Sequence, residues 1–236
     1  MNTIIKSIKI SILDLLFPKL CFRCGEVGRY VCNLCEKSQL RPKETQSCHV
    51  CKKEVFGNRL IHGYCRELTW LNGVVVGFEY NKFVEKLLLE FKYEGVFELK
   101  HILSKYLTHS IRSFYLLNKA GFVITTVPLH KRKKRKRGYD HLELLANLIS
   151  KKGGVEYKAL LEKKIRTKAQ VGLKRDDRLG NIIGSFRIKN EEFRMRNARV
   201  VLLDDIMTTG STLEECAKTL KAVGVKEVYG VVISRG

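Results

Sequence analysis

The spacing of apolar residues changes near residue 70. Beyond that point, short runs with almost no charge alternate with segments in which apolar residues recur at helical spacing. The uncharged runs predict buried strands and the periodic segments predict helices. In chain order we expect strand 73–80, helices 81–93 and 98–117, strand 122–129, helix 139–152, strand 199–205, helix 212–222 and strand 227–234. This alternation predicts an α/β domain over residues 71–236, with a parallel sheet flanked by helices.

Residues 1–70 show no such alternation and are expected to form a separate N-terminal head. Residues 1–20 carry apolar side chains at helical spacing, but Lys6, Lys9 and Asp14 interrupt the apolar core and no small-residue cleavage site follows. The segment is too short and too charged to cross a bilayer. It predicts an amphipathic helix that docks on the protein, with peripheral attachment to a membrane surface as the alternative.

Seven of the eight cysteines lie between residues 21 and 65. Without a secretory signal, such a cluster indicates a reducing compartment, here the cytoplasm, where it binds metal more often than it forms disulfides. Two Cys-x-x-Cys knuckles supply the tetrahedral sulfur set that zinc prefers. They predict a structural zinc site at Cys21, Cys24, Cys32 and Cys35. A redox pair or two disulfides are the weaker alternatives.

A second cluster has only three cysteines. Cys48, Cys51 and Cys65 resemble another pair of knuckles, but Leu68 stands where the fourth cysteine would fall. His62 could complete a Cys3His zinc site, and His49 is a poorer candidate because it lies inside the knuckle. A head of about 50 residues buries little apolar surface, so bound metal would supply much of its folding free energy.

The charge of the chain is strongly positive. Lysine and arginine number 45 against 24 acidic residues, which gives a formal net charge of +21. A balance of this kind indicates a polyanionic partner, such as nucleic acid, an acidic membrane surface or a phosphorylated ligand. Non-specific attraction to polyanions is the alternative.

A segment near the carboxyl end combines the features of a phosphate site. Val200 to Leu203 predict a buried strand that delivers Asp204 and Asp205 to its carboxyl end, where open α/β sheets bind ligands. The turn and helix that follow offer backbone N–H groups and a positive helix dipole to a phosphate. The turn consists of Thr208, Thr209, Gly210, Ser211 and Thr212. Because carboxylates can accept hydrogen bonds from the neutral hydroxyls of a sugar, the segment predicts a sugar phosphate ligand. The alternative is a simple capping turn with Ser211 or Thr212 as the N-cap.

This segment, "VVLLDDIMTTGST" (200–212), resembles the thirteen-residue phosphoribosyl pyrophosphate (PRPP) signature of type I phosphoribosyltransferases. The similarity continues through "FKYEG" (91–95), "VPLHKRKKRKRGYDHLELLA" (127–146) and "KIRTKAQVGLKRDDRLGNIIGSF" (164–186). With the cysteine-rich head in front, the chain is identified as a member of the ComF family of competence-associated proteins over nearly its whole length. Its visible departure from the family pattern is Leu68.

The resemblance implies a type I phosphoribosyltransferase fold with an N-terminal double zinc ribbon, and PRPP with Mg²⁺ as the ligand. On the matching positions it assigns Asp204 and Asp205 to the ribose hydroxyls at the catalytic centre and Thr208–Thr212 to the 5′-phosphate. The loop after strand 122–129 corresponds to the pyrophosphate loop, and segment 166–181 to a flexible loop that closes over the reacting centre. The candidates in these two loops are His130, Lys131, Arg137, Lys168, Gln170, Arg175 and Arg178.

Seven consecutive cations follow strand 122–129. They are Lys131, Arg132, Lys133, Lys134, Arg135, Lys136 and Arg137. Because like charges repel, we expect a solvated, mobile loop that orders when an anion binds. One pyrophosphate cannot use all seven charges, whereas single-stranded nucleic acid could, with Tyr93 or Tyr139 stacking on bases. The alternative is a solvated loop in which one or two residues touch pyrophosphate.

Two main functions follow from these features. The first is a PRPP-binding protein that handles single-stranded DNA during DNA uptake and natural competence, alongside proteins of the competence machinery. The second is an active phosphoribosyltransferase that transfers the phosphoribosyl group of PRPP to a salvage-type acceptor and releases pyrophosphate; a PRPP-sensing regulator is a weaker third. No residue stands out as a general base for a nucleobase, and the surplus positive charge favours the first.

Overall fold

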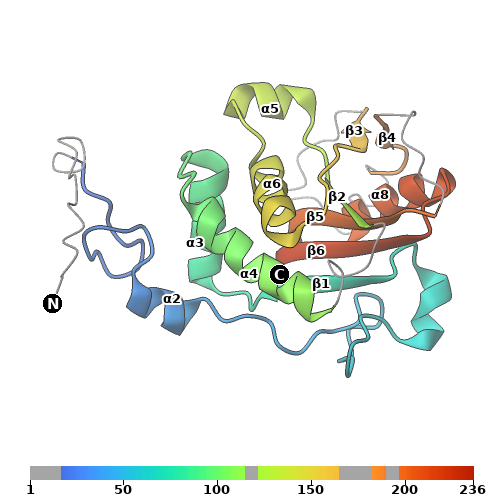
Figure 1. Cartoon of the computed structure of the whole chain (residues 1–236), viewed down its shortest axis with the longest axis horizontal. Coiled ribbons are helices and arrows are strands. Elements are labelled where there is room, and N and C mark those ends of the chain that lie inside the picture. Colours follow the sequence, from blue (N-terminus) through green and yellow to red (C-terminus); the bar gives the residue numbers. More distant parts are fainter. Residues whose placement is uncertain (1–16, 115–121, 165–181, 190–196) are drawn as a thin grey trace, which may run out of the picture.

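The computed structural model describes residues 17–114, 122–164, 182–189 and 197–236. Most of the expected amphipathic helix, residues 1–16, therefore lies outside the described residues. At the centre of the fold, β1 (Gly73–Phe78), β6 (Glu227–Arg235), β5 (Arg199–Met207) and β2 (Phe122–Thr126) form a sheet in that order (Figure 1). Every neighbouring pair is parallel, as the alternation of strands and helices predicted.

Helices cover both faces of this sheet. The helices α4 (Leu99–Ser113) and α6 (His141–Gly153) cross one face and pack against each other, and α3 (Lys82–Tyr93) leads into α4 (Figure 1). Helix α8 (Ser211–Ala222) connects β5 to β6 and packs against both strands. All six residues of β1 are buried, and so are Val200–Leu203 of β5, which α6 and α8 contact. The predicted α/β class is confirmed.

Several element boundaries differ from the predicted ones. Strand β2 ends at Thr126 rather than at residue 129, although the amide of Val127 still donates to the carbonyl of Leu203 at 2.9 Å. Pro128 has no amide hydrogen, so the ladder cannot continue. Strand β5 runs two residues beyond its predicted end because Ile206 and Met207 still pair with β6.

The basic run is a helix, so the predicted loop is wrong. Residues Lys131–Arg137 form α5, which stands above the sheet (Figure 1). The Nδ1 atom of His130 accepts a hydrogen bond from the amide of Arg132 at the N-terminus, and Gly138 closes the C-terminus at φ 80°. Lysine and arginine are good helix formers, and cations in the last turn interact favourably with the helix dipole. Local propensity and caps therefore outweigh repulsion among solvated charges, and none of the seven residues is buried.

A short antiparallel hairpin was not predicted. It consists of β3 (Leu161–Lys163) and β4 (Phe186–Ile188), and β4 packs against α8. Three residues are too few to show a strand period in sequence. Segment 166–181, which the resemblance predicts to be a flexible loop, lies outside the described residues, and residues 182–185 lead directly into β4.

The cysteine-rich segment extends along the sheet rather than lying at one end of it. It includes α2 (Asn33–Gln39) and the 3-10 helix η1 (Gly63–Leu68), which lie on opposite sides of the molecule (Figure 1). Between them the chain follows the outer edge of β1, where the side chain of Gln46 donates to the carbonyl of Val76 at 3.1 Å and accepts from its amide at 2.8 Å. These bonds satisfy backbone groups that an edge strand would otherwise expose. Among the described helices, none has the length and apolar character to span a bilayer; a boundary near residue 70 and a cytoplasmic location stay predictions.

Candidate functional site

Two adjacent carboxylates lie near the carboxyl end of β5. The Oδ1 atom of Asp204 accepts a hydrogen bond from the amide of Asp205 at 2.9 Å, and the Oδ1 atom of Asp205 accepts one from the amide of Ile206 at 2.6 Å. The Oδ2 atom of Asp205 also lies 2.5 Å from Nζ of Lys92 on α3 and 3.2 Å from Nε2 of the buried His141 on α6. Three elements that are distant in sequence therefore meet at one carboxylate.

The two carboxyl groups have opposite electrostatic environments. Burial and the neighbouring charge of Asp205 raise the pKa of Asp204 to about 8. Burial also acts to raise the pKa of Asp205, but the hydrogen bond from His141 and the charge of Lys92 outweigh it and hold that pKa below its usual range. At neutral pH the pair therefore carries one firm negative charge, and Asp204 holds a proton. Such a pair can accept hydrogen bonds from sugar hydroxyls and can also donate one.

The turn after the acids leads directly into α8. Gly210 is the N-cap residue of this helix, at φ 86°, and no side chain caps it, so the alternative of a capping turn with Ser211 or Thr212 as the N-cap is wrong. The hydroxyls of Thr209 and Ser211 instead contact each other at 2.9 Å, and Thr209 accepts from the amide of Ser211 at 3.3 Å. The amide of Ser211 is therefore occupied, but within the described residues those of Thr212 and Leu213 in the first turn of α8 remain available to an anionic ligand.

A cavity of about 870 Å³ joins these elements. Asp204, Asp205, the turn residues Thr208 to Gly210, and Thr212 line it from one side. Its described lining also includes six cations, which are Lys92, Arg132, Lys133, Lys136, Arg137 and Lys163. The pKa of Lys163 is lowered by burial and by the nearby charge of Lys133. A buried cation beside another positive charge is stabilised in its charged form by a polyanionic ligand.

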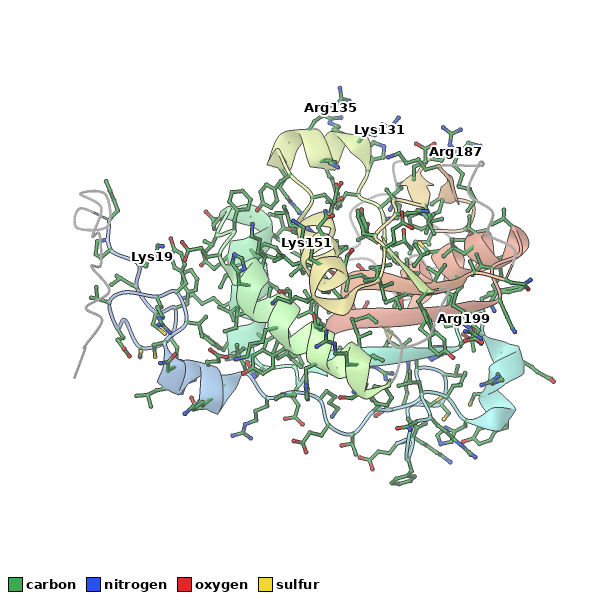
Figure 2. The ribbon with its side chains drawn as sticks, viewed as in Figure 1. Lys19, Lys131, Arg135, Lys151, Arg187 and Arg199 are labelled. Atoms are coloured by element: carbon green, nitrogen blue, oxygen red, sulfur yellow. The ribbon has the colours of Figure 1, made fainter. Side chains whose placement is uncertain are left out.

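Helix α5 presents its cations in two directions. His130 and four of the seven residues of α5 line the cavity, among them Arg137. The guanidinium of Arg137 lies 4.8 Å from the ring centroid of Tyr93, and its Nη1 atom lies 2.9 Å from Nδ1 of His141. Arg135 points away from the body of the protein (Figure 2), and Lys131 is exposed, with its Nζ atom 4.0 Å from Oε2 of Glu162 on β3. The basic run thus forms one rim of the cavity and also an outward cationic face.

Three residues of the site did not stand out in the sequence. Lys92 lies within the segment "FKYEG" and His141 within the segment 127–146, so the family resemblance was the available signal for both. Lys163 belongs to the hairpin that periodicity did not detect. Conversely, Lys168, Gln170, Arg175 and Arg178 lie outside the described residues. The roles assigned to the other site residues stay predictions.

The first cysteine cluster has the geometry of a metal site. The sulfur atoms of Cys21, Cys24, Cys32 and Cys35 all lie within 4.8 Å of one another. The Sγ atoms of Cys24 and Cys32 are 3.7 Å apart, and a tetrahedral zinc with Zn–S distances of about 2.3 Å requires ligand atoms about 3.8 Å apart. The four thiols therefore fit zinc without further rearrangement of their backbone.

The second cluster brings together Cys48, Cys51, His62 and Cys65, again with all ligand atoms within 4.8 Å. Nδ1 of His62 lies 3.3 Å from Sγ of Cys51, so the imidazole occupies the place of a fourth ligand. His49 points away, with its Nε2 atom 2.8 Å from Oγ1 of Thr69 and 3.3 Å from Oε1 of Glu214. Both four-donor sets are compatible with zinc, and neither includes an open position for catalysis.

Comparisons with known proteins agree with this architecture. The phosphoribosyl transferase domain family matches residues 143–235, which include both acids and the turn. The chain is 28% identical to Competence protein F of Haemophilus influenzae over 88% of this chain and 93% of that protein. It is 26% identical to DNA utilization protein YhgH of Escherichia coli K12, over 91% of this chain and 96% of that protein.

Among solved structures, a glutamine PRPP amidotransferase from B. subtilis is similar to 61% of this chain, at 19% identity and a TM-score of 0.40. The aligned region covers only 30% of that longer protein. The matching domain and the parallel sheet show a phosphoribosyltransferase-type fold, and the relatives that match over most of the chain support membership of the ComF family of competence-associated proteins.

Proposed function

We propose that this protein binds PRPP with Mg²⁺ at the carboxyl ends of its parallel strands and handles single-stranded DNA during natural competence. The observation that carries the proposal is the cavity in which one firm carboxylate charge faces six cations. The names of its relatives, Competence protein F and DNA utilization protein, support a role in DNA uptake.

PRPP suits the two ends of the cavity. The ribose hydroxyls would bind Asp204 and Asp205, and the 5′-phosphate would bind the amides and hydroxyls of residues 208–212. The pyrophosphate would lie toward α5, where Arg132, Lys133 and Lys136 face the cavity. Carboxylate oxygens are donors that Mg²⁺ accepts, but Asp205 already binds Lys92 and His141, so the ion would be held mainly by oxygens of the ligand.

Single-stranded DNA suits the outer face of α5. The side chain of Lys131 is 80% exposed although it lies 4.0 Å from Glu162, and that of Arg135 points away from the body of the protein (Figure 2). The ring of Tyr93 is 63% exposed beside Arg137 and could stack on a base. Tyr139 is a poorer platform, because its hydroxyl donates to the carbonyl of Phe91 at 2.6 Å and its ring packs edge-on against Phe97.

The test measures both ligands on the same variants. We expect wild-type protein to bind PRPP with Mg²⁺ by calorimetry and single-stranded DNA at about 0.1 M salt, where the Debye length is about 10 Å. The double variant Lys131→Gln/Arg135→Gln should retain PRPP affinity, and its salt dependence of DNA binding should weaken by about 1.4 in log–log slope if two phosphate contacts are lost. Asp204→Asn should lose PRPP affinity and keep DNA affinity. DNA handling is refuted if the wild type has no DNA affinity at this salt concentration.

A second candidate is an active phosphoribosyltransferase. The cavity volume of about 870 Å³ lies in the upper part of the range for small-molecule sites, which leaves space for an acceptor beside PRPP. The cations of the cavity would stabilise the departing pyrophosphate. Pyrophosphate release from PRPP, measured with a coupled assay across a panel of amines and nucleobases, tests this activity. Absence of release with every acceptor would leave PRPP as a ligand rather than a substrate.

A further inference from the structure

A second cavity lies at the amino ends of the strands, whereas the acid pair lies near the carboxyl end of β5. Its volume is about 540 Å³, and it lies between residues 58–66 of the second cysteine segment and the first residues of three strands. Those strand residues are Phe122 at the start of β2, Tyr229 near the start of β6, and Asn72, which precedes β1. We propose that this cavity binds a base and an adjacent phosphate of single-stranded DNA. The inference rests on the proposed DNA-handling function and extends it to a separate surface.

Aromatic rings provide the apolar part of this cavity. The ring centroids of Phe122 and Tyr229 are 6.1 Å apart, and half-buried Phe114 adds a third ring. The hydroxyl of Tyr229 donates to Oε2 of Glu227 at 3.1 Å, which holds the ring in place. Aromatic faces bind bases by stacking and tolerate any sequence, because every base has a π-face.

Guanidinium groups provide the anion-binding part. Arg59 and Arg66 line the cavity and are exposed, and within the described residues neither has a hydrogen bond or an ion pair. Nearby, Arg199 lies 5.9 Å from the ring centroid of Phe122, with its Nε atom 3.4 Å from Oε1 of Glu227. Arginine binds phosphate through paired, charge-assisted hydrogen bonds. Positive charge therefore exceeds negative charge around the three rings.

Close packing and backbone hydrogen bonds hold the residues around this cavity in place. A Cβ atom at Gly73 would lie 2.3 Å from Cβ of Leu60, so the cysteine segment packs directly on the start of β1. The amide of Asn72 donates to the carbonyl of Val228 at 2.7 Å, and its Oδ1 atom accepts from the amide of Val228 at 2.9 Å. Because the residues of the site are already ordered before a ligand binds, little binding free energy is lost in ordering them.

The side chains around the cavity favour an extended single strand of DNA over a free nucleotide. Exposed rings and cations alternate along residues 52–70, where Phe56, Tyr64 and Trp70 are 77%, 67% and 51% exposed. Arg59 and Arg66 lie between them in sequence. A free nucleotide would occupy the cavity alone, whereas a strand could also use rings and charges beyond its rim. Interleaved aromatic and basic side chains are typical of surfaces that bind single strands.

The experiment uses the full-length, zinc-loaded chain. We compare Arg59→Gln/Arg66→Gln with the charge-matched control Lys151→Gln/Lys218→Gln, whose side chains are exposed on α6 and α8 away from both cavities. The arginine variant should bind an oligodeoxythymidylate roughly tenfold more weakly and show a log–log salt slope smaller by about 1.4, whereas the control should match the wild type.

A second measurement does not depend on any variant. Wild-type protein is photocrosslinked to an oligonucleotide that contains 5-iododeoxyuridine, and adducts are mapped by mass spectrometry. We expect an adduct at half-buried Tyr229, in the tryptic peptide 227–235, because Phe122 lines the cavity but is only 6% exposed. Adducts confined to Tyr93 and α5, with an unchanged slope for the arginine variant, overturn this inference and leave the DNA-handling function intact. If wild-type protein binds no DNA, both this inference and the proposed DNA-handling function are refuted.

Discussion

Replacement of Asp204 by asparagine should stabilise the folded protein at neutral pH while it weakens PRPP binding. The folded-state pKa of Asp204 is raised to about 8, whereas an unfolded aspartate has a pKa of about 3.9. Between these values the folded state binds a proton that the unfolded state has released. Stability therefore falls as pH rises through this window, by at most about 1.4 kcal/mol per pH unit. The slope should approach this limit near pH 6 and fall to roughly half of it at pH 8, where half of the folded molecules have released the proton.

The assay is urea unfolding from pH 5 to pH 8 at constant zinc, followed by the fluorescence of Trp70, the single tryptophan. The free energy of unfolding of Asp204→Asn minus that of the wild type should grow steadily with pH, because asparagine cannot titrate. Titrations of other groups cancel in this difference. A difference that stays constant over the whole range refutes the assignment of the raised pKa to Asp204.

Asp205→Asn is the matched control, and its effect should have the opposite sign. The pKa of Asp205 is held below its usual range, so its contribution to stability is present above the unfolded pKa of about 3.9 and is lost only in more acidic solution. Its partner Lys92 has a side chain that is only 14% exposed and would lose its carboxylate. We expect a loss of about 2 kcal/mol, lower than for a fully buried pair because water reaches both groups, and nearly constant between pH 5 and pH 8.

Three further perturbations test other parts of the structure. His62→Ala should lower bound zinc from two ions to one per chain by elemental analysis, whereas His49→Ala should retain two. Glu214→Gln removes a charged acceptor from His49 and Thr69, so the urea midpoint should fall by an amount equivalent to about 1 to 2 kcal/mol, and proteolysis within residues 46–72 should accelerate. Gly210→Ala places a Cβ at φ 86°, which should cost about 1 to 2 kcal/mol in thermal unfolding and weaken PRPP binding by calorimetry.

The elements that sequence patterns predicted are those with strong local signals. The β5–α8–β6 unit follows from an uncharged run, a small-residue turn and a periodic segment, each of which determines its own conformation. The cysteine knuckles were equally visible, because ligand spacing within a knuckle is a local property. The basic run forms a helix in spite of repulsion among its charges because His130 and Gly138 cap its two ends.

Sequence by itself determined the alternation of strands and helices, the two cysteine clusters and the adjacency of Asp204 and Asp205, since these depend on neighbours along the chain. Tertiary structure decided that Lys92 and His141 meet Asp205, that His62 rather than His49 faces the second cluster, and that the two acids differ in pKa. The reason is that electrostatic interactions and burial depend on distance in space. Lys92 is more than a hundred residues from Asp205 along the chain, yet their charged atoms are 2.5 Å apart.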